Sequence, residues 1–186
     1  MTVHPWQLRQ AARHFWLGNL IAYPTEAVYG LGCNPLDWDA VQRLLQLKQR
    51  PIDKGLILIA SDFDQLRPFI IEPTQEIMAP VLKSWPGPTT WLLPAAPRVP
   101  KWLTGKHHSI AVRITAHPLA AELCRACKSP LISTSANITG HQPVKNPLGL
   151  QKQLNEKVDF ILHGKTGSLK QPTPIQDAIS GTFIRT

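Results

Sequence analysis

The stretch Leu131-Ile132-Ser133-Thr134-Ser135-Ala136-Asn137 predicts a buried strand that ends in small polar residues. Side chains alternate along a strand, so Ser133 and Ser135 are expected on one face. Asn137 follows where the strand should end. Hydroxyl and amide groups at the carboxyl end of a strand are typical ligand contacts in open α/β sheets, although Ser and Asn are also common where a strand turns. The stretch therefore predicts either one edge of a binding site or an ordinary turn.

Helix and strand patterns on both sides of this stretch predict an α/β protein. Helices interleave with strands early and hairpin-like strand pairs come late, so we expect a twisted, open, mixed parallel/antiparallel sheet flanked by helices. We see no repeat or linker that divides residues 1–186, which suits one domain. The predicted strands are 20–23, 56–60, 89–93, 109–115, 131–135, 158–162, 175–179 and 182–185; helices are predicted over 8–15, after Asp37, over 74–85 and 118–127, and near 148–154.

The composition indicates a globular protein outside the membrane. Hydrophobic residues make up 43% of the chain, and the longest apolar runs, such as 56–60, are far shorter than the roughly 20 residues that a membrane helix needs. Polar residues interrupt the N-terminal stretch, so we expect no signal peptide and a cytoplasmic location. Three cysteines cannot make a fully paired disulfide framework, which fits a reducing compartment. Cys124 and Cys127 form a CxxC, but they share a predicted helical stripe with Leu119 and Leu123 and are interpreted as core residues.

The basic residues are concentrated in the second half of the chain. The net charge is +8. Residues 1–96 hold 8 basic and 8 acidic residues, whereas residues 97–186 hold 12 basic and 4 acidic residues. A basic half suggests an anionic partner such as RNA. A solvated, soluble surface explains the same charge equally well.

Three cations cluster where a predicted helix ends. Lys48 occupies the next position of the apolar stripe of that helix, so its side chain either extends to solvent or points into a polar cleft. Pro51 pushes Arg50 out of helical geometry, and Lys54 follows closely. A basic pair at a helix C-terminus is favourable with the helix dipole alone. A binding site for a polyanion is the alternative.

Two further places contain candidate ligand groups. Arg113 alternates with small neighbours on one face of its predicted strand and either reaches across a groove or is an ordinary exposed arginine. Thr25, Glu26 and Tyr29 are expected in a loop that leaves the first strand, which is a binding loop or a turn without function. Gly164-Lys165-Thr166 is similar to the end of a phosphate-binding loop, but the first glycine that this motif requires is missing.

Five blocks of the sequence, taken in order, resemble the YrdC/TsaC family of threonylcarbamoyl-AMP synthases in its short, single-domain bacterial form. Five ordered blocks are far more specific than any one of them. Many members have a proline two residues after the arginine of the fourth block, where this chain has Thr115. The blocks are Ala22-Tyr23-Pro24-Thr25-Glu26-Ala27-Val28-Tyr29-Gly30-Leu31-Gly32, Lys48-Gln49-Arg50-Pro51 with Lys54, Trp85-Pro86-Gly87-Pro88-Thr89-Thr90, Ala111-Val112-Arg113, and Ser133-Thr134-Ser135-Ala136-Asn137 with Gly140.

The resemblance implies that L-threonine, bicarbonate and ATP give threonylcarbamoyl-adenylate and pyrophosphate, for the t6A modification of tRNA at position 37. It also implies a YrdC-like sheet with a concave basic cleft, and Mg²⁺ that accompanies ATP. Lys48 and Arg50 would be the catalytic cations. The implied ATP-binding residues are Lys48, Arg50, Lys54, Ser133, Ser135 and Asn137, and the implied threonine-binding residues are Thr25, Tyr29 and Arg113.

Two other functions fit the same residues. A basic concave domain could hold double-stranded RNA or tRNA without catalysis. A related domain of hydrogenase maturation proteins handles a carbamoyl-adenylate made from another carbamoyl donor. Contacts with tRNA or with other t6A-pathway proteins are also expected under the leading interpretation.

Overall fold

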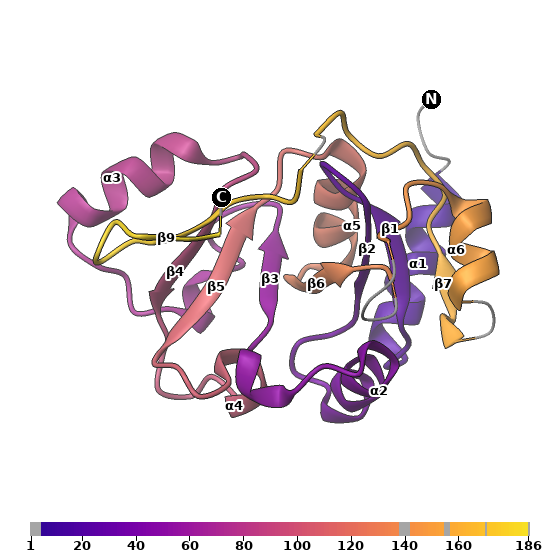
Figure 1. Ribbon diagram of the computed structural model, residues 1–186, viewed down its shortest axis with the longest axis horizontal. Coiled ribbons are helices and arrows are strands. Elements are labelled where there is room, and N and C mark those ends of the chain that lie inside the picture. Colours follow the sequence, from indigo (N-terminus) through magenta and orange to yellow (C-terminus); the bar gives the residue numbers. More distant parts are fainter. Residues whose placement is uncertain (1–4, 138–141, 155–156, 170, 186) are drawn as a thin grey trace.

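The computed structural model describes residues 5–137, 142–154, 157–169 and 171–185, and these residues form a mixed sheet with helices on both faces (Figure 1). Along the sheet the strands follow the order β7-β1-β2-β6-β3-β5-β4-β8-β9. The strands are β1 (Ile21–Pro24), β2 (Tyr29–Gly32), β3 (Ile57–Ala60), β4 (Thr90–Pro94), β5 (Ser109–Ile114), β6 (Leu131–Ser135), β7 (Phe160–Ile161), β8 (Ile175–Asp177) and β9 (Phe183–Arg185).

This sheet contains both parallel and antiparallel pairs. β1 pairs with β7, β3 with β5 and β4 with β8 in the parallel sense. The pairs β1–β2, β2–β6, β6–β3, β5–β4 and β8–β9 are antiparallel. The predicted mixed sheet is therefore confirmed.

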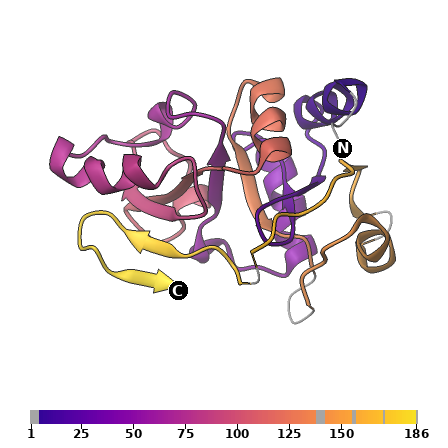
Figure 2. The ribbon, with the colours of Figure 1, turned by 90° about the horizontal axis from the view of Figure 1, so that it is seen from above.

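Helices cover the two faces of the sheet and enclose two apolar clusters. The helices are α1 (Pro5–Trp16), α2 (Trp38–Lys48), α3 (Gln75–Ser84), α4 (Lys101–Thr104), α5 (Pro118–Cys127) and α6 (Pro147–Leu154). α1 and α5 pack side by side on one face (Figure 2), where Phe15, Tyr23, Ile59 and Leu123 are buried together. α2, α3 and α6 contribute to the larger cluster on the other face. No helix among the described residues is long and apolar enough to cross a bilayer.

Local sequence signals set most of these boundaries. Asp37 caps α2, because its carboxylate accepts a hydrogen bond from the Ala40 backbone N–H at 3.1 Å. Cys124 and Cys127 lie fully buried in the cluster under α5, as the apolar stripe predicts. The expected terminal hairpin forms between β8 and β9, and Gly181 adopts a positive φ of 70° in its turn. The predicted strand over 158–162 is shorter, since only Phe160–Ile161 pairs with β1.

The prediction that Tyr29 lies in a loop is wrong. Tyr29 begins β2, and only residues 25–28 form the turn between β1 and β2. Two glycines in four residues hide this strand from propensity-based reasoning, because glycine weakens strands. Gly32 is required by close packing: a Cβ there would lie 1.9 Å from the carbonyl oxygen of Ile132. Of the matched motif residues, Gly140 lies outside the described residues.

A long segment joins the two ends of the sheet. β7 lies at one edge of the sheet, and the described residues 163–169 and 171–174 lie across the top of the molecule between β7 and β8, the neighbour of the opposite edge strand β9 (Figures 1 and 2). The crossing segment, as we call its described residues 163–169 and 171–174, contacts the turn between β1 and β2. Gly167 N–H donates to the Thr25 carbonyl at 2.9 Å, and Leu169 N–H donates to the Glu26 carbonyl at 3.1 Å.

The contact of Gly32 gives a first prediction. Gly32→Ala should lower the free energy of unfolding by about 3 kcal/mol, because the added methyl group overlaps backbone that cannot move aside. Gly181→Ala is the control, since a Cβ there meets nothing within 4 Å and only the positive φ costs about 1 kcal/mol. Urea unfolding measures both. Equal losses for the two variants would contradict the proposed overlap.

Candidate functional site

The centre of the sheet forms the floor of a cavity of about 860 Å³. Strand register places Ser133 beside Ile57, Ile57 beside Ala111, and Ala111 beside Leu92. Leu92 in turn pairs with Asp177 of β8. All five residues line the cavity. The alternation predicted for Ser133 and for the face of Arg113 thus contributes to a surface that five strands form together.

Cations predominate among the charged residues that line this cavity. Among the described residues, the lining holds five Lys or Arg side chains and one acidic side chain, Asp177. Burial, with Arg113 and then Arg50 nearby, lowers the pKa of Arg185. Guanidinium groups from three separate segments therefore lie within electrostatic range of one another, an arrangement that favours an anionic ligand. The five cations are Arg50, Lys54, Arg113, Lys145 and Arg185.

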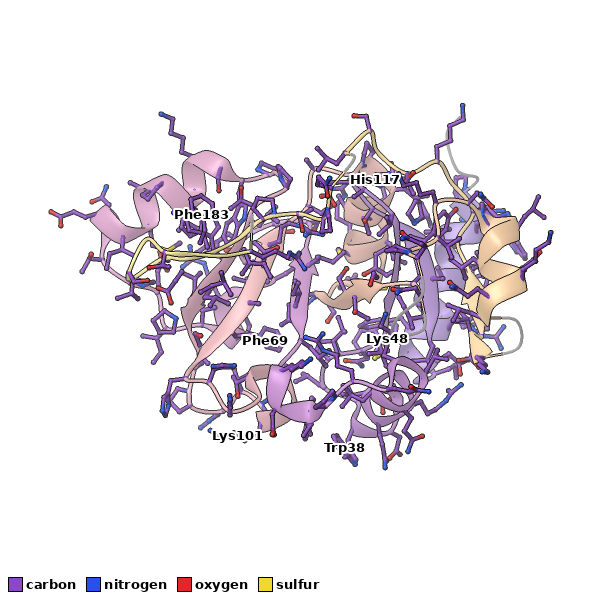
Figure 3. The ribbon with its side chains drawn as sticks, viewed as in Figure 1. Trp38, Lys48, Phe69, Lys101, His117 and Phe183 are labelled. Atoms are coloured by element: carbon purple, nitrogen blue, oxygen red, sulfur yellow. The ribbon has the colours of Figure 1, made fainter. Side chains whose placement is uncertain are left out.

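Lys48 lies behind the cavity wall and not on it. Its side chain is 5% exposed and points from the end of α2 toward the sheet (Figure 3). The ammonium donates to the carbonyl oxygens of Ser135 at 2.7 Å and Asn137 at 2.6 Å, and to Asn137 Oδ1 at 3.0 Å. Three short bonds match the three protons of an ammonium group. Burial, and to a lesser extent Arg50, lowers the pKa of Lys48 to about 8.

Arg50 and Lys54 face the cavity from the connection between α2 and β3. Gln49 ends α2 in the left-handed conformation, with φ 47°, and Pro51 follows Arg50, so the chain leaves the helix toward the cavity. Arg50 NH2 donates to the Gly55 carbonyl at 2.8 Å. Lys54 ends a short 3-10 helix, Ile52–Lys54. Both residues line the cavity.

Arg113 is buried in a polar network, so the interpretation as an ordinary exposed arginine is wrong. It is 4% exposed. Its NH2 lies 3.3 Å from Glu26 Oε2, and its NH1 donates to the hydroxyls of Thr90 at 3.2 Å and Thr173 at 2.7 Å. Its Nε is buried and has no hydrogen-bond partner among the described residues. A buried donor left unpaired costs about 1–3 kcal/mol, and functional sites are where such donors persist.

Glu26 supplies the counter-charge of Arg113. Its carboxylate Oε1 accepts from the Thr115 hydroxyl at 2.6 Å and from the Ala116 backbone N–H at 3.2 Å. Burial by itself raises the pKa of Glu26, but Arg113 and then Thr115 outweigh it, and the pKa lies below its usual value. Glu26 is therefore ionised in the folded protein at neutral pH.

The hydroxyls of Thr25 and Tyr29 are held by backbone groups. Thr25 Oγ1 donates to the Val28 carbonyl at 2.7 Å across the turn. Tyr29 Oη donates to the Gly164 carbonyl at 2.6 Å and accepts from Gly164 N–H at 3.0 Å. Both residues line the cavity. The Tyr29 hydroxyl thereby fixes the start of the crossing segment against β2.

The structure brings the nine predicted residues together, but in two layers. Seven line the cavity: Thr25, Tyr29, Arg50, Lys54, Arg113, Ser133 and Ser135. The other two, Lys48 and Asn137, contact each other behind it. Of the two alternatives for Lys48, the side chain that extends to solvent is wrong, because the ammonium is buried among polar groups at the end of β6, behind the cavity.

Sequence reasoning placed Glu26 in a candidate loop but gave it no role in the site, and it did not select Thr173 and Arg185. Glu26 lies in the same turn as Thr25. It was given no role because a carboxylate is not expected to bind an anionic ligand. Thr173 and Arg185 belong to the C-terminal part, where no motif was identified. Arg185 Nε and NH2 donate to the Thr173 carbonyl at 3.1 and 2.6 Å. The basic excess of residues 97–186 was the one available signal.

Comparison with known proteins places this site in a family context. The family model described as telomere recombination, for the Sua5, YciO and YrdC proteins, matches residues 15–186. A threonylcarbamoyl-AMP synthase of Stenotrophomonas maltophilia is 54% identical over 171 residues, which are 90% of this chain and 91% of that protein. A threonylcarbamoyl-AMP synthase of Methylococcus capsulatus is 49% identical over 179 residues, 96% of each chain.

A solved structure shares the fold. The structure of P. abyssi Sua5 complexed with L-threonine superposes with a TM-score of 0.89 at 34% identity. The match covers 95% of this chain and 52% of that chain, so the present chain spans about half of its length. The mixed sheet and its flanking helices are thus those of a known family.

The different surroundings of Lys48 and Arg50 give a second prediction. Lys48→Met should lower the free energy of unfolding by about 2–3 kcal/mol, because it removes a buried charged donor from three oxygen atoms at the end of β6. Arg50→Met is the matched control and should cost less than about 1 kcal/mol, since Arg50 is half-buried at the cavity edge. Urea unfolding at pH 7 measures both. A smaller loss for Lys48→Met than for Arg50→Met would contradict the buried position.

The lowered pKa of Glu26 gives a third prediction. Its ionised form contributes stability that is fully present above the usual value of 4.5 and is lost as pH falls through the lower folded value. Glu26→Gln should therefore destabilise the protein by about 3 kcal/mol at pH 7. The difference from wild type should shrink between pH 5 and pH 3, as measured by urea unfolding at each pH. A difference that stays constant over this range would exclude an ionised Glu26 as its source.

Proposed function

Since the chain belongs to the Sua5/YciO/YrdC family, we propose that it is a threonylcarbamoyl-AMP synthase. It makes L-threonylcarbamoyladenylate from L-threonine, bicarbonate and ATP and releases pyrophosphate. This makes it a nucleotidyltransferase that supplies the intermediate for t6A at position 37 of tRNA. The reading as an RNA-binding module without catalysis has no support in the names of its relatives, which describe an enzyme.

One observation supports this proposal most directly: three arginines from distant segments converge on one cavity. Arg50, Arg113 and Arg185 line a space of about 860 Å³, which is within the range of nucleotide-sized ligand sites. Guanidinium groups suit phosphates and carboxylates because their planar fork matches two oxygens at once. ATP and threonine together bring both kinds of group.

The reaction joins three substrates in two steps. The amine nitrogen of L-threonine bonds to the carbon of bicarbonate, and water leaves with one amine proton, which gives a carbamate. A carbamate oxygen then bonds to the α-phosphorus of ATP, and the bond from that phosphorus to the pyrophosphate oxygen breaks. Neither step needs a covalent nucleophile from the protein, so positioning supplies a large part of the acceleration.

The cavity residues divide between the two anionic substrates in this proposal. Arg50 and Lys54 neutralise charge that grows on the phosphate oxygens and on departing pyrophosphate. Ser133 and Ser135 offer hydroxyls to the nucleotide from the same strand. In this conformation Lys48 acts on the nucleotide indirectly. Its ammonium donates to the carbonyl oxygens of Asn137 and Ser135 and holds these residues in place. Its expected direct role toward ATP stays a prediction.

Arg113 is the residue best suited to hold the threonine carboxylate. Its NH1 donates to the hydroxyls of Thr90 and Thr173, and its NH2 donates to Glu26. Its Nε has no hydrogen-bond partner among the described residues. A carboxylate would satisfy that buried donor. Thr25 and Tyr29 then shape the adjoining wall of the threonine pocket.

Mg²⁺ enters this proposal together with ATP. Mg²⁺ binds carboxylates and phosphate oxygens, but Asp177 is the one acidic side chain among the described lining residues. Its Oδ1 already accepts from the backbone N–H groups of Ile179 at 2.8 Å and Ser180 at 2.9 Å. The donor set does not form a carboxylate site for the metal. We therefore derive no step through it, and the triphosphate would be its main ligand.

Contacts with macromolecules form the outer part of the proposal. The basic residues of the C-terminal half fit contacts with tRNA or with other proteins of the t6A pathway. The cytoplasm, where tRNA and ATP are available, is the expected location. A dependence of tRNA binding on salt concentration would support the first of these contacts.

The fourth prediction tests the reaction itself. Full-length protein with ATP, L-threonine and bicarbonate should give threonylcarbamoyl-adenylate, detected by mass spectrometry, and an equal amount of pyrophosphate. Omission of any one substrate should abolish both products. Arg50→Met should lower kcat/KM at least about 100-fold, as expected for loss of a charge that stabilises the transition state, while the protein stays folded.

Three outcomes would contradict the proposal. Turnover of ATP that does not depend on threonine would exclude the synthase. Adenylate formation with carbamoyl phosphate in place of bicarbonate and threonine would indicate the chemistry of the hydrogenase maturation domain. Binding of tRNA that ignores ATP and threonine, with no adenylate formed, would favour the module without catalysis.

A further inference from the structure

We propose that Thr115 and Glu26 form a positioning pair that fixes Arg113 and so sets the affinity of the cavity for the carboxylate of its amino-acid substrate. This inference rests on the proposed function, because it assigns Arg113 to that carboxylate. Neither Thr115 nor Glu26 is among the residues that line the cavity. Both would act through Arg113.

The three side chains form a continuous buried chain of hydrogen bonds. Thr115 is 2% exposed and Glu26 7% exposed. The Thr115 hydroxyl donates to Glu26 Oε1 at 2.6 Å, and Glu26 Oε2 receives Arg113 NH2 at 3.3 Å. Short bonds between a hydroxyl and a carboxylate are among the strong ones. The position of the Arg113 guanidinium is therefore coupled, through Glu26, to the hydroxyl of Thr115, two residues later in the sequence.

Backbone contacts hold the pair in place from three sides. The Ala116 N–H donates to Glu26 Oε1 at 3.2 Å, and the His117 N–H donates to Thr115 Oγ1 at 3.2 Å. The crossing segment contacts the backbone of Glu26 through the Leu169 N–H at 3.1 Å. It also provides Thr173, whose hydroxyl accepts from Arg113 NH1 at 2.7 Å. Little freedom remains for Glu26 once these contacts form.

The charged and titratable groups around Glu26 come from three elements. Arg113 of β5 faces it directly, and His117, at the start of α5, also favours its ionised form. His117 Nε2 donates to the Lys165 carbonyl at 3.1 Å, beneath the crossing segment (Figure 3). Tyr23 of β1 lies within electrostatic range. Of the groups that lower the pKa of Glu26, Thr115 is second to Arg113, so its loss should weaken the ion pair in acid.

The bond to Glu26 depends on the hydroxyl of residue 115. Thr115 Oγ1 donates to Glu26 Oε1 at 2.6 Å. Proline has no side-chain donor and could not make this bond. In this chain the orientation of Arg113 therefore depends on a removable hydrogen bond.

Thr115→Val removes the hydroxyl with little change in volume and is the principal test. The KM for L-threonine should rise about tenfold, since a hydrogen bond to a charged group is lost, while kcat and the KM for ATP change less than about twofold. The inhibition constant of L-threoninamide, which lacks the carboxylate, should also change less than about twofold. As pH falls, kcat/KM for threonine should begin to decline at a higher pH than in wild type.

Three further variants make the test specific. Thr115→Ser keeps the hydroxyl and should keep the threonine KM within about twofold of wild type. Thr74→Val makes the same exchange at an exposed threonine that has no capping hydrogen bond and should change none of the constants. Thr115→Ala removes the same hydroxyl and replaces the valine variant if circular dichroism shows that Thr115→Val does not fold.

The outcomes separate this inference from the proposed function. A wild-type protein without threonine-dependent adenylate formation overturns the proposed function, and the positioning role with it. An active wild type with an unchanged threonine KM in Thr115→Val overturns the positioning role alone. So does an equal rise of the threonine KM and the threoninamide inhibition constant, because recognition of the carboxylate would then not be involved.

Discussion

A buried ammonium group ties the first half of the chain to the strand that closes the site. Lys48 brings three protons to three oxygen atoms at the end of β6. A charge in this position is tolerated only when its hydrogen bonds are complete. The end of α2 and the end of β6 must therefore meet in one geometry. That geometry sends Arg50 and Lys54 out of α2 toward the cavity and holds Ser135 at its edge.

Charge compensation then decides which cations are available to a ligand. Lys48 is satisfied by protein oxygens, and Arg113 is only partly satisfied by Glu26, Thr90 and Thr173. Arg50 and Arg185 each donate to one backbone carbonyl. Of the cations in the matched sequence blocks, Lys48 thus supports the site from behind. Arg50 and Arg113 line the cavity. Because protein oxygen atoms compensate the charge of Lys48 and part of that of Arg113, a strongly cationic cavity is compatible with a stable fold.

The crossing segment completes the site from the far end of the chain. It connects the two edges of the sheet and contacts the turn that holds Thr25 and Glu26 on its way. Tyr29 and His117 anchor its beginning, and Thr173 brings it to Arg113. Most of these contacts use backbone groups of the segment, which is why their effect does not depend strongly on which side chains it has.

The sequence by itself determined the mixed sheet, most helix boundaries, and seven of the residues that line the cavity, because periodicity, caps and ordered motifs are local. It did not reveal β2, since Gly30 and Gly32 are poor strand formers, and close packing against Ile132 requires glycine at position 32. Nor did it reveal whether Arg113 was exposed, that Glu26 is its partner, or that the Lys48 ammonium is buried against Ser135 and Asn137. Those facts depend on strand register and on contacts between residues 87 or more positions apart, and only the tertiary structure brings such groups together.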